Sequence, residues 1–299
     1  MSFYTMKYLH KIIILAVLLA VLFGVGSASY AIDMPRIDRS KIRLYIKPGG
    51  AESGEITIEN TTDEMMFVKV YLQDWYYASG DGSKNFVPPS TTVHSCASWI
   101  SFSPADLAIP PFSRKGVKYN VKVPEGANGG YYAVLFFENQ IGGPLSGDLK
   151  EAVGVNVAVR FATLFYIEAD GTAQREARVG NIFLKKAGLY APLLINGDFR
   201  NNGNVDIISS GVFAIMDQNG RVQGRGQIND IYTLPGDNTK LKGIWRESLA
   251  PGDYAFILTL DLGKGGHKSE LQRGPFLIKE IEIKIASDGS LSDYKVSKE

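Results

Sequence analysis

The segment EAVGVNVAVRFATLFYIE, residues 151–168, decides how the rest of this sequence is interpreted. Its apolar side chains occur at every second position: Val153, Val155, Val157, Val159 and Phe161. Such a period of two is typical of a β-strand with one apolar face. The pattern alone fits two interpretations: the face packs in this protein's own core, or it completes the core of another protein.

Residues 1–31 are predicted to be a signal peptide. Lys7 and Lys11 precede the apolar stretch IIILAVLLAVLFGVG, and the small residues of SASYA follow it. Cleavage is expected after Ala31, with Ser29 and Ala31 at the two specificity positions. The apolar stretch is short for a membrane-spanning helix, which needs about 20 residues, so a signal peptide is favoured over an anchor. The mature protein is therefore expected to be exported.

Composition and motifs give no support for an enzyme or a cofactor. The 32 Lys+Arg balance 31 Asp+Glu, which argues against nucleic acid as a partner. Cys96 is the only cysteine, so no internal disulfide can form. His10, His94 and His267 share no metal-ligand spacing with one another or with Cys96, and no paired carboxylates stand out. We therefore expect a protein without catalytic residues, metal or small-molecule cofactor.

The remaining sequence predicts short strands separated by Gly, Pro and Asn turns, the pattern of a β-sandwich. In the first half, strands are expected at residues 41–46, 55–60, 66–77, 97–104, 106–111, 115–124, 130–140 and 151–168. The polar stretch EADGTAQREAR then predicts a domain boundary near Thr172, after which strands resume at 179–186, 190–204, 209–227, 229–245, 252–263 and 275–286. Asn219-Gly220 is a strong hairpin signal.

The predicted fold is therefore all-β, with two tandem immunoglobulin-like β-sandwich domains, 32–172 and 173–299, after the signal peptide. Large aromatic residues on these strands are expected to fill the core of the first sandwich. They are Trp75, Trp99, Phe102 and Tyr131.

Residues 41–167 resemble the PapD-like periplasmic pilus-assembly chaperones. The resemblance is carried by the order of KIRLYIKPGG, GEITIENTTDEMMFVKVYLQDW, WISFSPADLAIPPFSRKGVKYNVKVPEG, GGYYAVLFFE and a long strand ending in TLFY. The second half, with RNNGNVDI, DQNGRV and LAPGDYAFILTLDLG, resembles these proteins only loosely. The resemblance implies a periplasmic chaperone whose partners are secreted pilin-like or other surface-fibre subunits. It leaves open whether an outer-membrane usher takes part.

The resemblance also implies roles for named residues. Val153, Val155, Val157 and Val159 would form the donor strand, which fills the apolar groove of a subunit that lacks a strand of its own.

Two basic residues of the family hold the subunit's terminal carboxylate. Arg43 matches the first of them. Thr163 stands where the second, a lysine, is expected, and Arg160 is the nearest base. The alternative function is an exported structural or adhesive immunoglobulin-like protein, which would bury the apolar strand face in its own core.

Overall fold

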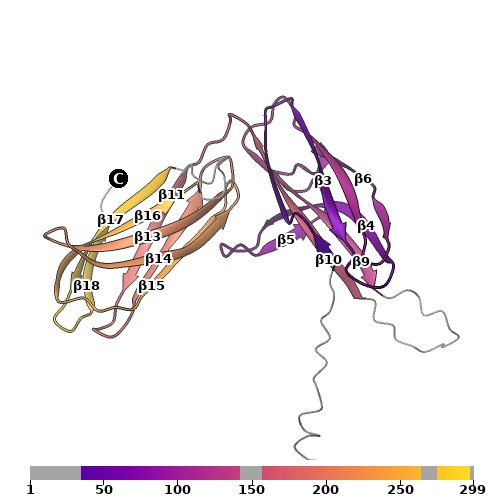
Figure 1. Ribbon diagram of the computed structural model, residues 1–299. Coiled ribbons are helices and arrows are strands. Elements are labelled where there is room, and N and C mark those ends of the chain that lie inside the picture. The colour runs from indigo at the N-terminus through magenta and orange to yellow at the C-terminus, as the bar shows by residue number, and fades with distance from the viewer. Residues whose placement is uncertain (1–34, 142–156, 264–274, 297–299) are drawn as a thin grey trace, which may run out of the picture. The chain divides into compact units, whose positions relative to one another are not determined.

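The structure is a computed structural model that describes residues 35–141, 157–263 and 275–296 (Figure 1). Its first half consists of β-strands and one short 3-10 helix, η1. These elements are β1 (Arg36–Ile37), β2 (Lys41–Ile46), β3 (Ala51–Glu59), β4 (Met66–Tyr77), β5 (Lys84–Val87), η1 (Ala97–Trp99), β6 (Ile100–Ser103), β7 (Asp106–Ile109), β8 (Arg114–Lys122), β9 (Gly130–Ile141) and β10 (Val157–Ala169).

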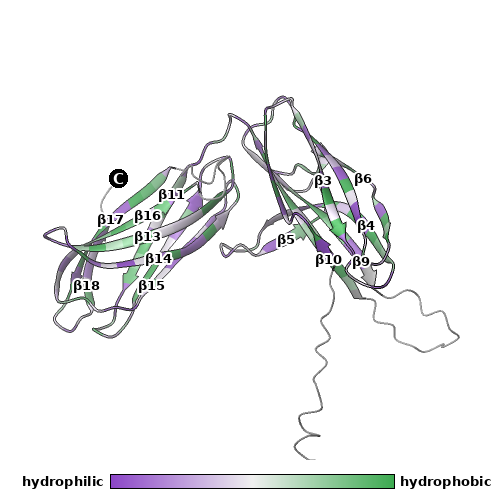
Figure 2. Cartoon of the chain, in the orientation of Figure 1, coloured by the Kyte–Doolittle hydropathy of each residue, from purple (hydrophilic) through white to green (hydrophobic). Residues whose placement is uncertain are grey.

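Two sheets face each other in this half and enclose one core. One sheet has the strand order β1-β3-β8-β6, and the other has the order β2-β10-β9-β4-β5, with β7 paired to β4. Polar and apolar residues alternate along these strands (Figure 2), so each sheet turns one apolar face inward. Ile56 and Val117 from one sheet and Leu135 and Phe165 from the other are fully buried in the same cluster. The alternation seen in the sequence is thus the cause of a β-sandwich.

The second half begins with β11 and is also all strand. Its strands are β11 (Ala177–Lys185), β12 (Leu193–Asn201), β13 (Ile207–Asp217), β14 (Val222–Thr233), β15 (Asn238–Trp245), β16 (Gly252–Asp261), β17 (Phe276–Ile285) and β18 (Leu291–Val296). Hydrogen bonds connect them in the order β11-β12-β15-β14-β13-β16-β17-β18. The tight turn at Asn219-Gly220 joins β13 to β14, and Gly220 takes the positive φ of 75° that such a turn needs.

This long sheet folds over at its middle and so makes a second sandwich. Strands β14 and β15 share a single register pair, Ile228 with Gly243, where the sheet bends. A Cβ at Gly243 would lie 2.6 Å from Cδ1 of Ile228, so the absence of a side chain here lets Ile228 pack closely against the backbone. Phe199 from β12 and Phe256 from β16 are fully buried in the core between the two layers.

The predicted all-β fold of two sandwiches is confirmed, with local differences. Residues 78–85 were interpreted as loop from the sequence, but Lys84 and Asn85 open β5, and the strand expected from residue 97 begins with η1. Trp99, Phe102 and Tyr131 pack against the core as expected. The boundary near Thr172 stays a prediction, and the proposed signal peptide lies outside the described residues. No helix within the described ranges is long and apolar enough to cross a membrane.

Candidate functional site

Half of strand β10 has a neighbour on one side only. Antiparallel β9 pairs with β10 from Val157 to Glu168, whereas parallel β2 pairs with it only from Leu164 to Ala169. Among the described residues, no strand lies beside Val157–Thr163 on the side away from β9. This free edge, about 20 Å long at about 3.3 Å per residue, presents unpaired backbone groups that another strand can bond.

The two faces of β10 have different surroundings. Phe165 and Ile167 are buried in the core of the first sandwich, while Tyr166 points away from that core into a second apolar cluster. Val159 lies on the same side as Phe165 because they are six residues apart on the strand. It is half-buried and does not belong to the core cluster. The row of side chains on the core-facing side of β10 therefore extends past the end of this protein's own core.

The outward face of the six-stranded sheet carries an aromatic cluster. Trp75, Tyr132 and Tyr166 meet edge to face, with ring centroids 5.2–5.7 Å apart. The hydroxyl oxygens of Tyr77 and Tyr166 lie 3.2 Å apart, and burial raises the pKa of Tyr166 to about 12. Leu234 of the second sandwich belongs to the same buried cluster. Trp75 thus fills this outward cluster and not the sandwich core for which it was predicted.

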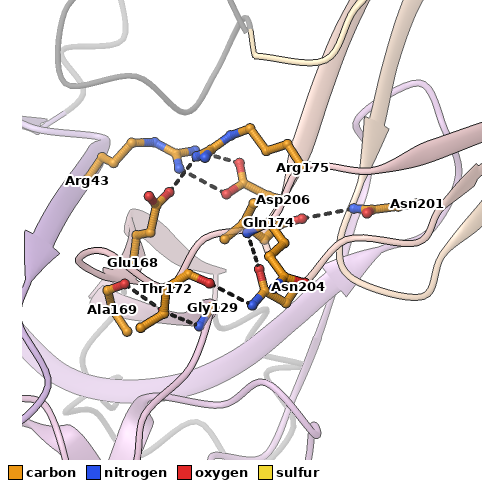
Figure 3. Close-up of polar contacts among 11 residues, drawn as sticks. Arg43, Gly129, Glu168, Ala169, Thr172, Gln174, Arg175, Asn201, Asn204 and Asp206 are labelled. Carbon is orange, nitrogen blue, oxygen red and sulfur yellow. Dashed lines mark hydrogen bonds and ion pairs between the residues drawn. The ribbon is translucent and has the colours of Figure 1, made fainter. Parts of the chain in front are cut away.

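Arg43 projects from β2 at the edge of this cluster and is bound to a carboxylate (Figure 3). Its Nη1 and Nη2 atoms donate to Oδ1 and Oδ2 of Asp206 at 2.9 and 2.6 Å. Only 12% of the Arg43 side chain and 2% of the Asp206 side chain are exposed. Burial would lower the pKa of Arg43, but Asp206 outweighs burial and raises it. The guanidinium of Arg43 therefore stays charged although both side chains are largely shielded from solvent.

A second buried ion pair lies beside the first (Figure 3). The Nη2 atom of Arg175 is 2.5 Å from Oε2 of Glu168, at the end of β10. Burial raises the pKa of Glu168, and Arg175 opposes this shift. Asn204 adds neutral links nearby, since its Nδ2 donates to Thr172 and its Oδ1 accepts from the Gln174 backbone. These ion pairs and hydrogen bonds hold the chain after β10 against the β12–β13 loop.

Two lysines stand apart from these pairs. Nζ of Lys41 lies 4.4 Å from the centroid of the Tyr166 ring, and Nζ of Lys84 lies 5.4 Å from that of Tyr77. Burial, and then Arg43, lower the pKa of Lys41, and burial lowers that of Lys84. Within the described residues, neither lysine has an ion-pair partner closer than 4 Å. Both are thus partly desolvated cations that form no direct ion pair with a carboxylate of the described residues.

These lysines line one cavity of about 380 Å³. Its other walls are mostly apolar or aromatic: Ser40, Tyr77, Phe86, Ala162, Leu164, Tyr166, Ile208 and Tyr232. An apolar pocket with a few cations is suited to an anionic group attached to an apolar side chain.

The residues predicted from the sequence are not gathered at one point. Arg43 is engaged by Asp206, and Arg160 is exposed, with its guanidinium carbon 5.1 Å from the Phe136 ring centroid. Thr163 is buried and donates its hydroxyl to the backbone oxygen of Arg39 at 2.6 Å.

The predicted donor strand is only partly described. Val157 opens β10 and Val159 lies within it, whereas Val153 and Val155 lie outside the described residues. The donor-strand and anchor assignments therefore stay predictions.

Sequence reasoning missed Lys41, Lys84 and Asp206. Lys41 precedes Arg43 by two positions on a strand, so both side chains had to share a face, which is a signal the sequence does contain. Lys84 was interpreted as part of a loop. Asp206 is 163 residues from Arg43, and no local pattern connects the two.

Comparisons with known proteins find similarity at the level of structure. No family model matches the sequence, and no curated protein matches it. The chaperone CfaA of class 5 fimbriae is 15% identical, with a TM-score of 0.47 over 83% of this chain and 98% of that chain. The chaperone DraB of E. coli is 11% identical, with a TM-score of 0.39 over 89% and 98%. A chaperone–tip adhesin complex of CFA/I fimbriae is 13% identical, with a TM-score of 0.47 over 82% and 98%. Fimbrial chaperones are thus among the solved proteins whose fold is similar to that of this chain.

Proposed function

We propose that this protein is a chaperone for exported fibre subunits and that it acts by adding strand β10 to an incomplete subunit sandwich. The observation that carries the proposal is the free edge of β10 at Val157–Thr163. A strand of the subunit would form backbone hydrogen bonds with β10 along this edge. Alternate side chains of β10 would then fill the subunit's groove. The similar solved proteins CfaA and DraB are also chaperones by name.

The side chain of Val159 supports the proposal that the core-facing side of β10 enters the subunit's groove. It faces the core side of β10 but is only half-buried, so it has apolar surface left to place in a partner. Val153, Val155 and Val157 would extend the same row, as the sequence predicts. A subunit that lacks one strand exposes an apolar groove that aggregates unless it is covered, and this row is suited to cover it.

Lys41 and Lys84 are the cations we propose for the subunit's terminal carboxylate. Arg43 already holds the carboxylate of Asp206 in a bidentate pair, so its part is to fix β2 beside the second sandwich. Lys41 is partly desolvated and lies on the cavity wall, where an incoming carboxylate would restore the charge balance. The adjoining aromatic wall would hold an apolar side chain near the subunit's end.

Co-purification with a co-expressed fibre subunit tests the proposal. Val159→Asp places a charge in the row that enters the groove, so the β-rich partner should be lost from a protein that is still folded. Ala158→Asp is the matched control, because Ala158 is the exposed neighbour on the opposite face. Lys41→Gln should weaken the complex without abolishing it. If Val159→Asp and Ala158→Asp retain the partner equally, β10 is not donated, and the adhesive alternative is favoured.

A further inference from the structure

The outer face of the second sandwich exposes an apolar strip that no described residue covers. It spans β14, β13, β16 and β17, which are neighbours in that order (Figure 1). Val212 is 53% exposed, Ile278 62%, Phe276 48% and Val222 42%. A soluble β-sandwich usually places polar side chains at such outward positions. Large apolar side chains grouped on one open sheet face are typical of an interaction surface.

The strand registers define how this strip is arranged. Val212 pairs with Gln227 on one side and Thr259 on the other, and Thr259 pairs with Ile278. The next outward row contains, in strand order, Arg225, Ala214, Ile257 and Glu280. Each row thus has small or apolar side chains at its two central positions. In the second row, opposite charges stand at the two ends.

Arg225 and Glu280 lie symmetrically about the line between β13 and β16. Three strand spacings of about 4.8 Å separate them, so each is about 7 Å from that line. Both side chains are exposed, and neither has an ion-pair partner within the described part of the chain. A two-fold axis along this line, parallel to the strands, brings β14 of one copy over β17 of another. Arg225 of each copy then faces Glu280 of the other.

We propose that this strip binds a second copy of the same chain, as a face-to-face dimer of second sandwiches. The interface would place Ala214 and Ile257 of each copy against each other at its centre, with two reciprocal Arg225–Glu280 pairs at its sides. Packed sheets lie about 10 Å apart, a distance that these two long side chains span together.

The charges also select the orientation of the dimer. A two-fold axis through the same row but perpendicular to the strands would place Arg225 over Arg225 and Glu280 over Glu280. Like charges juxtaposed across an interface suppress that arrangement. The charges of this row are therefore complementary in one orientation, as a two-fold symmetric interface requires.

Sedimentation velocity over a range of protein concentrations tests the proposal. The wild-type protein should show a monomer–dimer equilibrium. Arg225→Glu and Glu280→Arg should each raise the dissociation constant about tenfold or more, because each creates two repulsive pairs. The double variant should restore dimerisation, since it re-creates both pairs with the charges exchanged. Ile278→Lys should also disrupt the dimer.

The control reverses a charge elsewhere. Arg114→Glu alters an exposed ion pair with Glu59 on the first sandwich and should leave association unchanged. Circular dichroism establishes that each variant is folded. A wild-type protein that stays monomeric overturns the proposal. The proposal is also overturned if the single charge reversals leave the dissociation constant unchanged, as they would if the copies associated through the edge of β10. A double variant that does not regain dimerisation overturns it as well.

Discussion

Removing the carboxylate of Asp206 should destabilise the protein strongly. Asp206→Ala leaves the guanidinium of Arg43 buried with no opposite charge, and it deletes two charge-assisted hydrogen bonds of 2.9 and 2.6 Å. At about 1.5–3 kcal/mol for each such bond, the expected loss is about 3–5 kcal/mol, the range found when one partner of a buried pair is removed. Only 12% and 2% of the two side chains are exposed, so solvent relieves little of this cost.

Urea unfolding followed by tryptophan fluorescence measures this loss, because Trp75 lies in the cluster beside Arg43. The matched control is Asp198→Ala, which removes an ion pair with Lys240 whose side chains are 38% and 70% exposed. That control should cost far less than Asp206→Ala, because solvent screens an exposed ion pair. Arg43→Met combined with Asp206→Leu should recover most of the stability, because no buried charge remains. If Asp206→Ala costs no more than Asp198→Ala, the buried pair does not hold the structure as described.

Three other residues give independent predictions. Burial lowers the pKa of Lys41 below 10.5, so the folded state binds fewer protons than the unfolded state just below that pH, and stability gains as pH rises through this window. Lys41→Met should therefore be more stable than wild type at pH 7, and the difference in unfolding free energy should shrink towards pH 10; a constant difference would contradict this. Cys96 is fully buried and its thiol pKa is raised, so thiol reagents should label it only after unfolding, and rapid labelling of the native protein would refute this. Asn60 is fully buried and donates to Glu64, Ile109 and Pro110, so Asn60→Ala should lower the unfolding free energy by about 2–4 kcal/mol in a urea titration; a loss below about 1 kcal/mol would show that these bonds are dispensable.

Period-two alternation predicted most strands, because a strand with one buried and one solvated face has alternating apolar and polar residues in its sequence. Strands β4 and β9 lie where residues 66–77 and 130–140 predicted them. Which strands pair with each other cannot be predicted from such a local pattern. The parallel pairing of β2 with β10, which ends at Leu164 and so creates the free edge, depends on contacts between residues more than a hundred positions apart.

The chemistry of the site was predictable only in part for the same reason. Arg43 could be identified as a candidate only through the resemblance to a known family, and its partner Asp206 comes from the other sandwich. Lys84 could not be placed, because a four-residue strand between turn residues resembles a loop. A lysine becomes desolvated through its neighbours in space, which sequence patterns do not specify.

Hydrogen–deuterium exchange of the backbone amides of β10 tests the central claim most directly. The free protein and its complex with a co-purified fibre subunit are compared peptide by peptide. Donation of the strand predicts that exchange slows on binding at Val157–Thr163, where one side of β10 is open, and changes little at Leu164–Ala169, where β2 and β9 already pair with it. Unchanged exchange at Val157–Thr163 in a stable complex would show that the subunit binds elsewhere and would contradict the proposed function.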